Sequence, residues 1–156
     1  MTTAPIRDAT ADDLGRLLAL RRAFFETQIA AGLLDLPADL PAMLERTTPA
    51  LVQGKRQHCF VAGADGSAEA YLWAVLRLVP GMRHTVVGSI EEVYAAPALQ
   101  GTGAAGRLVE RAVAWLRQQG ATRIQTRVLA DNGRALAFWA RAGFAENVHI
   151  LEFASK

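Results

Sequence analysis

The sequence predicts one α+β domain built on a mixed β-sheet and spanning residues 1–156. Three strand-like segments separated by short turns occupy residues 57–95, which is typical of an antiparallel meander. Residues 86–129 then read as a strand, an amphipathic helix and a second strand, and such a unit forms a parallel pair with a right-handed crossover. A chain of 156 residues is long enough to bury the core that this sheet needs.

The N-terminal part of the chain predicts a short strand and two helices. The strand begins at residues 6–7, and Thr10 is a suitable N-cap for a helix over residues 12–29. Leucine and phenylalanine recur at helical spacing in this helix, although Arg21 interrupts the apolar stripe. A second helix is expected over about residues 38–45, after a glycine and a proline break the first pattern.

The middle of the chain predicts the meander. Its three strands are expected at residues 57–62, 69–79 and 86–95. Residues 64–67, Ala-Asp-Gly-Ser, supply the turn chemistry for a hairpin between the first two strands. The third strand carries the acidic pair Glu91-Glu92, and successive side chains in a strand point to opposite faces. We therefore expect only one of the two carboxylates on a given side of the sheet.

The C-terminal part predicts two more helices and two more strands. A long amphipathic helix ends at Gly120, a natural C-terminal cap, and a strand is expected over residues 121–129. Asn132 can cap a helix over residues 132–142. A last strand is expected over residues 148–153.

A glycine-rich turn, Gln-Gly-Thr-Gly-Ala-Ala-Gly at residues 100–106, leads into the long helix. Small residues let the backbone approach a ligand, and the first N–H groups of a helix have no partners inside it. Together with the helix dipole they predict an anion site suited to phosphate. The turn also fits the dinucleotide fingerprint G-x-G-x-x-G, but residues 96–100 separate it from its strand and the unit occurs once. By itself the turn could equally do no more than begin a helix.

Composition excludes several classes of protein. Hydrophobic residues make up 51% of the chain and charged residues 21%, with a net charge of +2 and arginines spread along the sequence, which argues against a nucleic-acid surface. No apolar run is long enough for a membrane span, and no signal peptide is expected. The single cysteine, Cys59, and the lack of metal-ligand spacing among the histidines predict a cytoplasmic protein without an internal disulfide or a metal.

Four motifs resemble those of the GNAT superfamily of N-acetyltransferases. They are Ile-Glu-Glu-Val-Tyr-Ala-Ala-Pro at 90–97, Gln-Gly-Thr-Gly-Ala-Ala at 100–105, Asn-Gly-Arg-Ala at 132–135 and Phe-Trp-x-x-x-Gly-Phe at 138–144. They stand in family order and spacing over roughly residues 88–145. The resemblance implies a three-layer fold, with a mostly antiparallel mixed sheet, helices on both faces and a central parallel strand pair that splays at the CoA site.

The same resemblance implies acetyl-CoA as the cosubstrate, with its pyrophosphate on the glycine turn and its pantetheine arm between the two splayed strands. The implied CoA-binding residues are Val93, Tyr94, Ala95, Gln100, Gly101, Thr102, Gly103, Ala104, Ala105, Gly106, Asn132 and Trp139. The expected reaction is direct transfer to a primary amine, of a small molecule first, in a ternary complex. A protein or peptide amine, or a non-catalytic acyl-CoA-binding module, remains an alternative. The resemblance also allows a homodimer.

An attacking amine must lose a proton, because a free alkylamine has a pKa of about 10.4. Glu91 is the first candidate base and Glu92 the second, and Glu91 is expected to share its side with Val93 and Ala95 while Tyr94 points away. Many relatives place a tyrosine where this chain has Trp139, whose indole cannot protonate the departing thiolate. A thiol with a pKa of about 8.5 leaves without a dedicated acid.

The acceptor side is the least patterned part of the sequence. By resemblance, the first helices lie over it, which makes Phe24, Phe25 and Gln28 candidates for lining the acceptor pocket. Phe24 and Phe25 fit a simple core position at least as well. His84, in the loop before the Glu91 strand, is a further candidate.

Overall fold

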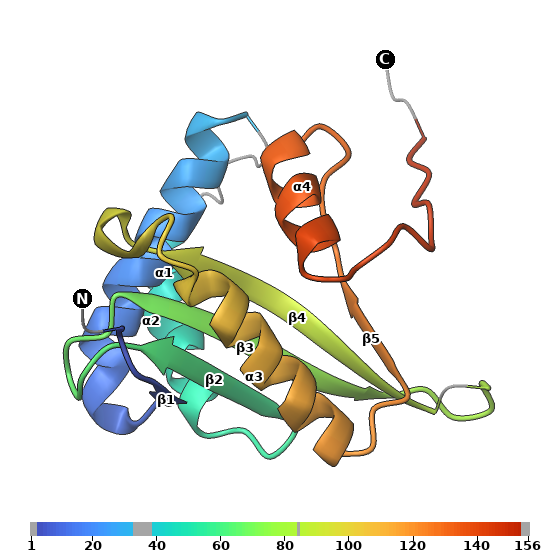
Figure 1. The fold of residues 1–156 in the computed structure, drawn as a ribbon, viewed down its shortest axis with the longest axis horizontal. Coiled ribbons are helices and arrows are strands. Elements are labelled where there is room, and N and C mark those ends of the chain that lie inside the picture. Colours follow the sequence, from blue (N-terminus) through green and yellow to red (C-terminus); the bar gives the residue numbers. More distant parts are fainter. Residues whose placement is uncertain (1–2, 33–38, 84, 154–156) are drawn as a thin grey trace.

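A computed structural model describes residues 3–32, 39–83 and 85–153 of the chain. One five-stranded sheet runs through the molecule, with helices packed around it (Figure 1). In chain order the elements are β1 (Ile6–Asp8), a 3₁₀ turn (Ala11–Asp13), α1 (Leu14–Ala30), α2 (Leu40–Thr47), a 3₁₀ turn (Thr48–Val52), β2 (Gln57–Ala62), β3 (Ala70–Leu78), β4 (Val86–Ala95), a 3₁₀ turn (Pro97–Leu99), α3 (Ala104–Gln118), β5 (Arg123–Thr126) and α4 (Gly133–Arg141).

The sheet has the strand order β1-β2-β3-β4-β5. The first four strands pair antiparallel, and β4 pairs parallel with β5 through the crossover helix α3. The prediction of a mixed, mostly antiparallel sheet is therefore confirmed.

Each face of the sheet has its own apolar core, because alternate strand residues point to opposite sides. On one face Phe60, Leu72 and Ile90 pack with Leu108 and Leu116 of α3. On the other face, Val61 and Tyr71 pack with leucines of α1 and of the 3₁₀ turn after α2. Figure 1 shows α3 on one side of the strands and α1 with α2 on the other, which confirms the three layers.

The entry into α1 is held by a buried carboxylate. Asp13 accepts a hydrogen bond from the Thr10 backbone N–H at 2.9 Å, and Arg7 donates to both of its oxygens at 2.7 and 2.8 Å. The Arg7 hydrogen bonds lower the pKa of Asp13 to about 2, although its burial acts in the opposite direction. Because this carboxylate stays ionised, β1 and the start of α1 remain tied together through the neutral pH range.

Two strand predictions differ from the structure. The strand expected over residues 121–129 forms only at Arg123–Thr126, because β4 diverges from it beyond that point and leaves no partner backbone. The strand expected over residues 148–153 is absent: this segment is irregular, and Leu151 and Phe153 are 91% and 96% exposed. It does not run along β5 or any other described strand (Figure 1), so its alternating apolar residues have no ladder to join. The proposed start of α2 at residue 38 lies outside the described residues, and the helix itself runs from Leu40 to Thr47.

Candidate functional site

The parallel pair β4–β5 splits halfway along β4. Ladder pairing runs from Val87 opposite Arg123 to Ile90 opposite Thr126 and then stops. At the last rung the Thr126 hydroxyl donates to the Ile90 carbonyl at 3.0 Å. Residues 91–95 of β4 continue beside β3 alone, so their other edge is not paired with β5. The expected splay is confirmed, and it creates an open strand edge that a peptide-like ligand can join.

The glycine turn lies just beyond the open end of β4. Gly101 and Gly103 have φ angles of 76° and 81°, a left-handed conformation that favours glycine. The backbone N–H groups of Gly101, Gly103, Ala105 and Gly106 donate to no acceptor within the described ranges. Four unpartnered donors at the N-terminus of a 15-residue helix form a nest for an anion.

Side chains of the turn hold it in place. The Gln100 amide donates to the Ala95 carbonyl at 3.0 Å, which ties the turn to the end of β4. The Thr102 hydroxyl donates to the Leu99 carbonyl at 2.6 Å and accepts from the Ala104 N–H at 3.4 Å. These two side chains thus shape the nest, while glycine and alanine backbone supplies its free donors.

Two predicted CoA-binding residues lie beyond the split, Asn132 at the N-cap of α4 and Trp139 within the helix. Asn132 accepts a hydrogen bond from the Ala135 N–H at 3.1 Å, which confirms its role as a helix cap. Trp139 is 7% exposed and packs edge-on against Phe138 and Phe144, in contact with the α3-side core. Gly143, with a φ of 92°, ends the helix, and the Phe144 N–H returns to the Trp139 carbonyl at 2.9 Å.

A β-bulge places Glu91 and Glu92 on the same side of the sheet. Trp73 of β3 is opposite Glu92 and the next residue, Ala74, is opposite Ile90, so Glu91 is an extra residue in β4. Glu91 bonds to Arg77, which stands opposite Val87 on the face away from α3, and Glu92 bonds to groups under α1. The expectation that the two glutamates face opposite sides is wrong, because a flat strand was assumed.

The bulge also changes the neighbours of the pair. Val93 and Ala95 pack against the α3-side core, whereas Tyr94 packs against the α1-side core. Glu91 therefore does not share its side with Val93 and Ala95, as expected from strict alternation. Tyr94 does share it, so its phenol lies on the side of both carboxylates.

Glu92 is buried in an ion pair that joins β4 to α1. It is 6% exposed, and its oxygens accept from Nε and Nη2 of Arg21 at 2.9 and 2.8 Å and from the Tyr71 hydroxyl at 2.8 Å. Arg21 is 2% exposed and also donates to the hydroxyls of Thr47 and Thr48. Burial and the adjacent Glu92 carboxylate raise the pKa of the Tyr71 phenol well above its usual value. Every polar group in this cluster is engaged.

Glu91 is more accessible. Its carboxylate accepts a hydrogen bond from Arg77 at 2.8 Å, and the side chain remains 23% exposed. Partial burial raises its pKa, but hydrogen bonds from Arg77 and Ser89 and the charge of Arg127 lower it more, so the pKa lies below the ordinary value. Glu91 is therefore an ionised carboxylate beside the split, with one strong cationic neighbour.

The predicted acceptor residues lie near the C-terminal end of α1. Phe24 and Phe25 stack edge-to-face at 5.2 Å and are half-buried, as is Gln28. The Arg21 guanidinium lies 6.0 Å from the Phe25 ring and 5.9 Å from the Trp73 ring, so Phe25 covers the buried ion pair. His84 lies outside the described residues.

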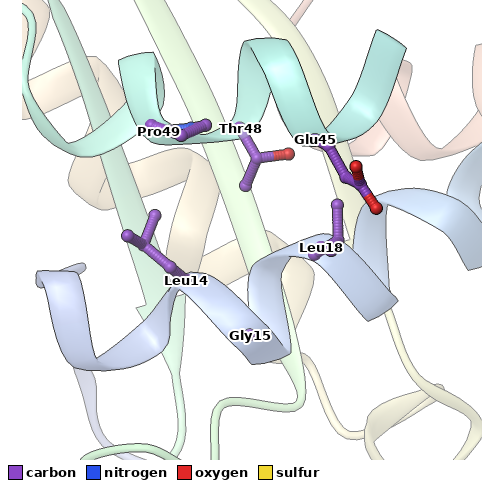
Figure 2. Close-up of a pocket in the computed structure, with 6 residues that line it drawn as sticks. All are labelled: Leu14, Gly15, Leu18, Glu45, Thr48 and Pro49. Atoms are coloured by element: carbon purple, nitrogen blue, oxygen red, sulfur yellow. The ribbon is translucent and has the colours of Figure 1, made fainter. Parts of the chain in front are cut away.

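A hollow of about 210 Å³ separates α1 from α2 and the turn after it. Figure 2 shows Leu14 and Leu18 on one wall and Glu45, Thr48 and Pro49 on the other. The Thr48 hydroxyl is already used, since it donates to Leu44 and accepts from Arg21. This hollow thus belongs to the packing of the two helices and is separate from the split strand pair.

Sequence reasoning missed Arg21, Tyr71 and Arg77 as parts of the site. The interruption of the α1 stripe by Arg21 was a visible signal, because an arginine on an apolar face requires an acidic partner. The partner itself could not be read from the sequence. Cys59 is buried, as expected, and burial raises the pKa of its thiol far above the usual value.

Within residues 3–32, 39–83 and 85–153, no group of histidine, cysteine, aspartate or glutamate side chains is placed to hold a metal ion. No helix in the same ranges is long and apolar enough to cross a membrane. The chemistry available at the split is therefore that of an anion nest, an open strand edge and an ionised carboxylate.

Comparison with known proteins agrees with this geometry. The model of the acetyltransferase (GNAT) family matches residues 19–144. An aminoglycoside N(6')-acetyltransferase type 1 of Acinetobacter haemolyticus is 31% identical over 98 residues, which cover 62% of this chain and 68% of that protein.

Solved structures agree as well. The aminoglycoside 6'-N-acetyltransferase AAC(6')-IG of A. haemolyticus superposes with a TM-score of 0.76 and 27% identity, over 97% of this chain and 98% of that one. AAC(6')-Iy, in complex with a bisubstrate analogue of CoA and acetylneamine, has a TM-score of 0.80 at 18% identity over 99% of both chains, which supports the fold. The chain therefore belongs to the acetyltransferase (GNAT) family and is an acetyl-CoA-dependent N-acetyltransferase.

Proposed function

We propose that this chain transfers the acetyl group of acetyl-CoA to a primary amine of a small molecule, by direct attack in a ternary complex. The observation that carries the proposal is the juxtaposition at the split: an anion nest, an unpaired edge of β4 and the ionised Glu91 follow one another along one strand and its turn. The names of the relatives, aminoglycoside acetyltransferases, support a small-molecule acceptor.

The donor half of the site fits CoA. The free N–H groups of residues 101–106 would bind the pyrophosphate, and the open edge at Val93 would pair with the amide groups of the pantetheine arm. The Ala95 carbonyl already accepts from Gln100, so we assign Ala95 a smaller part in that pairing. Asn132, with an amide nitrogen left beyond its capping role, and Trp139 would border the thiol end.

We propose Glu91, rather than Glu92, as the group that takes the proton from the amine, directly or through a water molecule. Glu92 is occupied by Arg21 and Tyr71, whereas Glu91 is partly exposed beside the split. The amine nitrogen then bonds to the acetyl carbon, the carbon–sulfur bond breaks, and the thiolate leaves with the electron pair. Cys59 is buried and held as a thiol, which supports direct transfer over an acetyl-cysteine intermediate.

An acetylation assay tests this function. The chain is incubated with acetyl-CoA and a panel of small-molecule amines and lysine peptides, and both thiol release and the mass of the N-acetyl product are measured. We expect thiol release only with an amine, intersecting initial-velocity lines, and a kcat about 100-fold lower for Glu91→Gln, the low end for a general base because its pKa is already depressed. Glu110→Gln, on the exposed face of α3, is the matched control.

Two results would decide against the proposal. Acetylation of peptides alone would favour a protein acceptor. Tight CoA binding without a product from any amine would favour a non-catalytic acyl-CoA-binding module. In that case the Glu91→Gln variant would behave as the unmodified chain does.

We also propose that the chain forms a single domain, is cytoplasmic and forms a homodimer. The two cores share one sheet, which supports a single domain, and the lone buried cysteine supports a cytoplasmic location. The segment 145–153 supports the dimer, because Val148, Ile150 and Phe153 are 66%, 61% and 96% exposed while β5, the last strand of the sheet, pairs only with β4. A second copy would cover these side chains.

Serine at all three of these positions should therefore dissociate the dimer. By light scattering, we expect the unmodified chain at about twice its 16.8 kDa and the triple variant at 16.8 kDa. Leu78→Ser, which removes a 51% exposed apolar residue elsewhere, is the control. A monomeric unmodified chain would contradict the dimer.

A further inference from the structure

A second hollow, of about 410 Å³, lies on the face of the sheet that carries Glu91, at the other end of β4. Its walls hold three arginines, Arg77, Arg83 and Arg123, around the apolar side chains of Val79, Met82 and Val87. None of the described residues that line it is acidic. We call this hollow the arginine pocket.

The arginine pocket is continuous with the candidate base. Val87 and Ser89 precede Glu91 at alternate positions of β4, and Arg77 stands opposite Val87. The Arg77 guanidinium both lines the pocket and bonds to Glu91 at 2.8 Å. Glu91 follows Val87 by four positions, about 13 Å along the strand, and the side chains of Arg77 and Glu91 together span this distance.

The pocket carries an excess of positive charge. Arg83 and Arg123 form no salt bridge and donate no side-chain hydrogen bond within the described part of the chain. Arg127 adds a fourth cation close enough to affect Glu91. Among the described residues, the lining of the pocket holds no carboxylate to set against these four cations, and Glu91 is the acid that bonds to Arg77, so the potential favours an anion.

The phosphates of CoA are not the anions that this pocket fits. The nest at residues 101–106 follows the C-terminal end of β4, whereas Val87 and Arg123 lie at the opposite end. Ala95 follows Val87 by eight positions, about 26 Å along the strand. The arginine pocket is therefore at the end of β4 away from the nest, on the face of the sheet that carries Glu91.

We propose that the acceptor is an amine carrying an oxyanion, a carboxylate or a phosphate, which binds Arg123 and Arg83 while its amine lies at Glu91. This inference rests on the proposed function. The apolar side chains between the two ends fit a hydrocarbon linker, and Arg77 is placed to exchange its bond with Glu91 for one with the oxyanion. Aminoglycosides, the substrates in the names of the relatives, carry several ammonium groups, and the arginines repel such polycations.

The reaction with such an acceptor balances as it does for any amine. The nitrogen loses one proton toward Glu91 and bonds to the acetyl carbon, the carbon–sulfur bond of acetyl-CoA breaks, and the thiolate takes up a proton. The oxyanion does not react. It binds and orients the acceptor, so its loss should raise KM more than it lowers kcat.

The test compares amines that differ only in charge. Glycine, 4-aminobutanoate and 6-aminohexanoate are each assayed beside the corresponding amide, 2-aminoethyl phosphate beside ethanolamine, and the aminoglycoside neamine by itself. We expect kcat/KM to be about 10- to 100-fold higher for the charged member of the best pair than for its neutral partner, because the charged amine has the lower KM. The number of carbon atoms in the best charged amine gives the length of the linker, and its oxyanion shows whether the pocket prefers a carboxylate or a phosphate.

Arg123→Gln should reduce the ratio of kcat/KM between the charged amine and its neutral partner about tenfold, whereas Arg117→Gln, on the opposite helix α3, should leave the ratio unchanged. Equal rates for charged and neutral amines, or a preference for neamine, would overturn this inference and leave the proposed function standing. If no amine in the panel is acetylated although CoA binds, the proposed function itself fails.

Discussion

Replacing Gly103 with glutamate should abolish CoA binding and leave the fold intact. Gly103 is the N-cap of α3, with a φ of 81°, and a Cβ added there meets no atom within 4 Å. A side chain therefore costs only the strain of a left-handed residue, about 1–2 kcal/mol. Its carboxylate, however, lies beside the four free N–H groups and repels the pyrophosphate. Losing two charge-assisted hydrogen bonds predicts a Kd for CoA at least about 1000-fold higher.

Titration calorimetry with CoA measures this effect, and two variants separate its causes. Gly103→Ala introduces the strain without the charge and should weaken binding less than tenfold. Ala114→Glu adds the same charge on the exposed face of α3, away from the nest, and should bind as the unmodified chain does. If Gly103→Glu keeps its affinity for CoA, the assignment of the nest to the pyrophosphate is wrong.

The second large effect concerns stability. Glu92→Gln leaves the Arg21 guanidinium buried without a counter-charge, because Arg21 has only hydroxyls as its remaining partners. Removing one member of a buried ion pair costs about 3–5 kcal/mol, so we expect the free energy of unfolding to fall by that amount. Urea denaturation of the unmodified chain and the variant measures the difference.

A double variant tests whether the cost comes from the unpaired charge. Arg21→Met combined with Glu92→Leu removes both charges and should recover more than half of the loss, since apolar replacements of similar volume often restore stability. The summed losses of the single variants Arg21→Met and Glu92→Leu would then exceed the loss in the double variant. Additive losses would show that Arg21 and Glu92 act independently, contrary to their 2.8 Å contact.

Most of the fold was predictable because its elements have clear periodicity and clear ends. β2 and β4 have the expected bounds, and Asn132 caps α4 as predicted. The glycine turn was recognisable for the same reason, since its conformation depends on small residues that are visible in the sequence.

The interior of the site was less predictable, because it depends on partners distant in the chain. Nothing local to Glu91 marks a bulge, which appears only when β4 is paired with β3. Arg21 is 71 positions from Glu92, and nothing in the sequence around either residue identifies the other as its partner. Residues 148–153 alternate like a strand, but a strand also requires a neighbour, and the sequence says nothing about one.

The extra residue in β4 shifts the alternation of its side chains by one position. Before Glu91 the even-numbered positions, such as Gly88 and Ile90, face α3; after it the odd-numbered positions, Val93 and Ala95, do so. Deleting Glu91 would restore strict alternation and leave Val93 and Ala95 facing α3, with Glu92 alone between Ile90 and Val93 on the other face. The bulge therefore adds a second carboxylate to the face away from α3 without moving the apolar residues that pack against α3 before and after it.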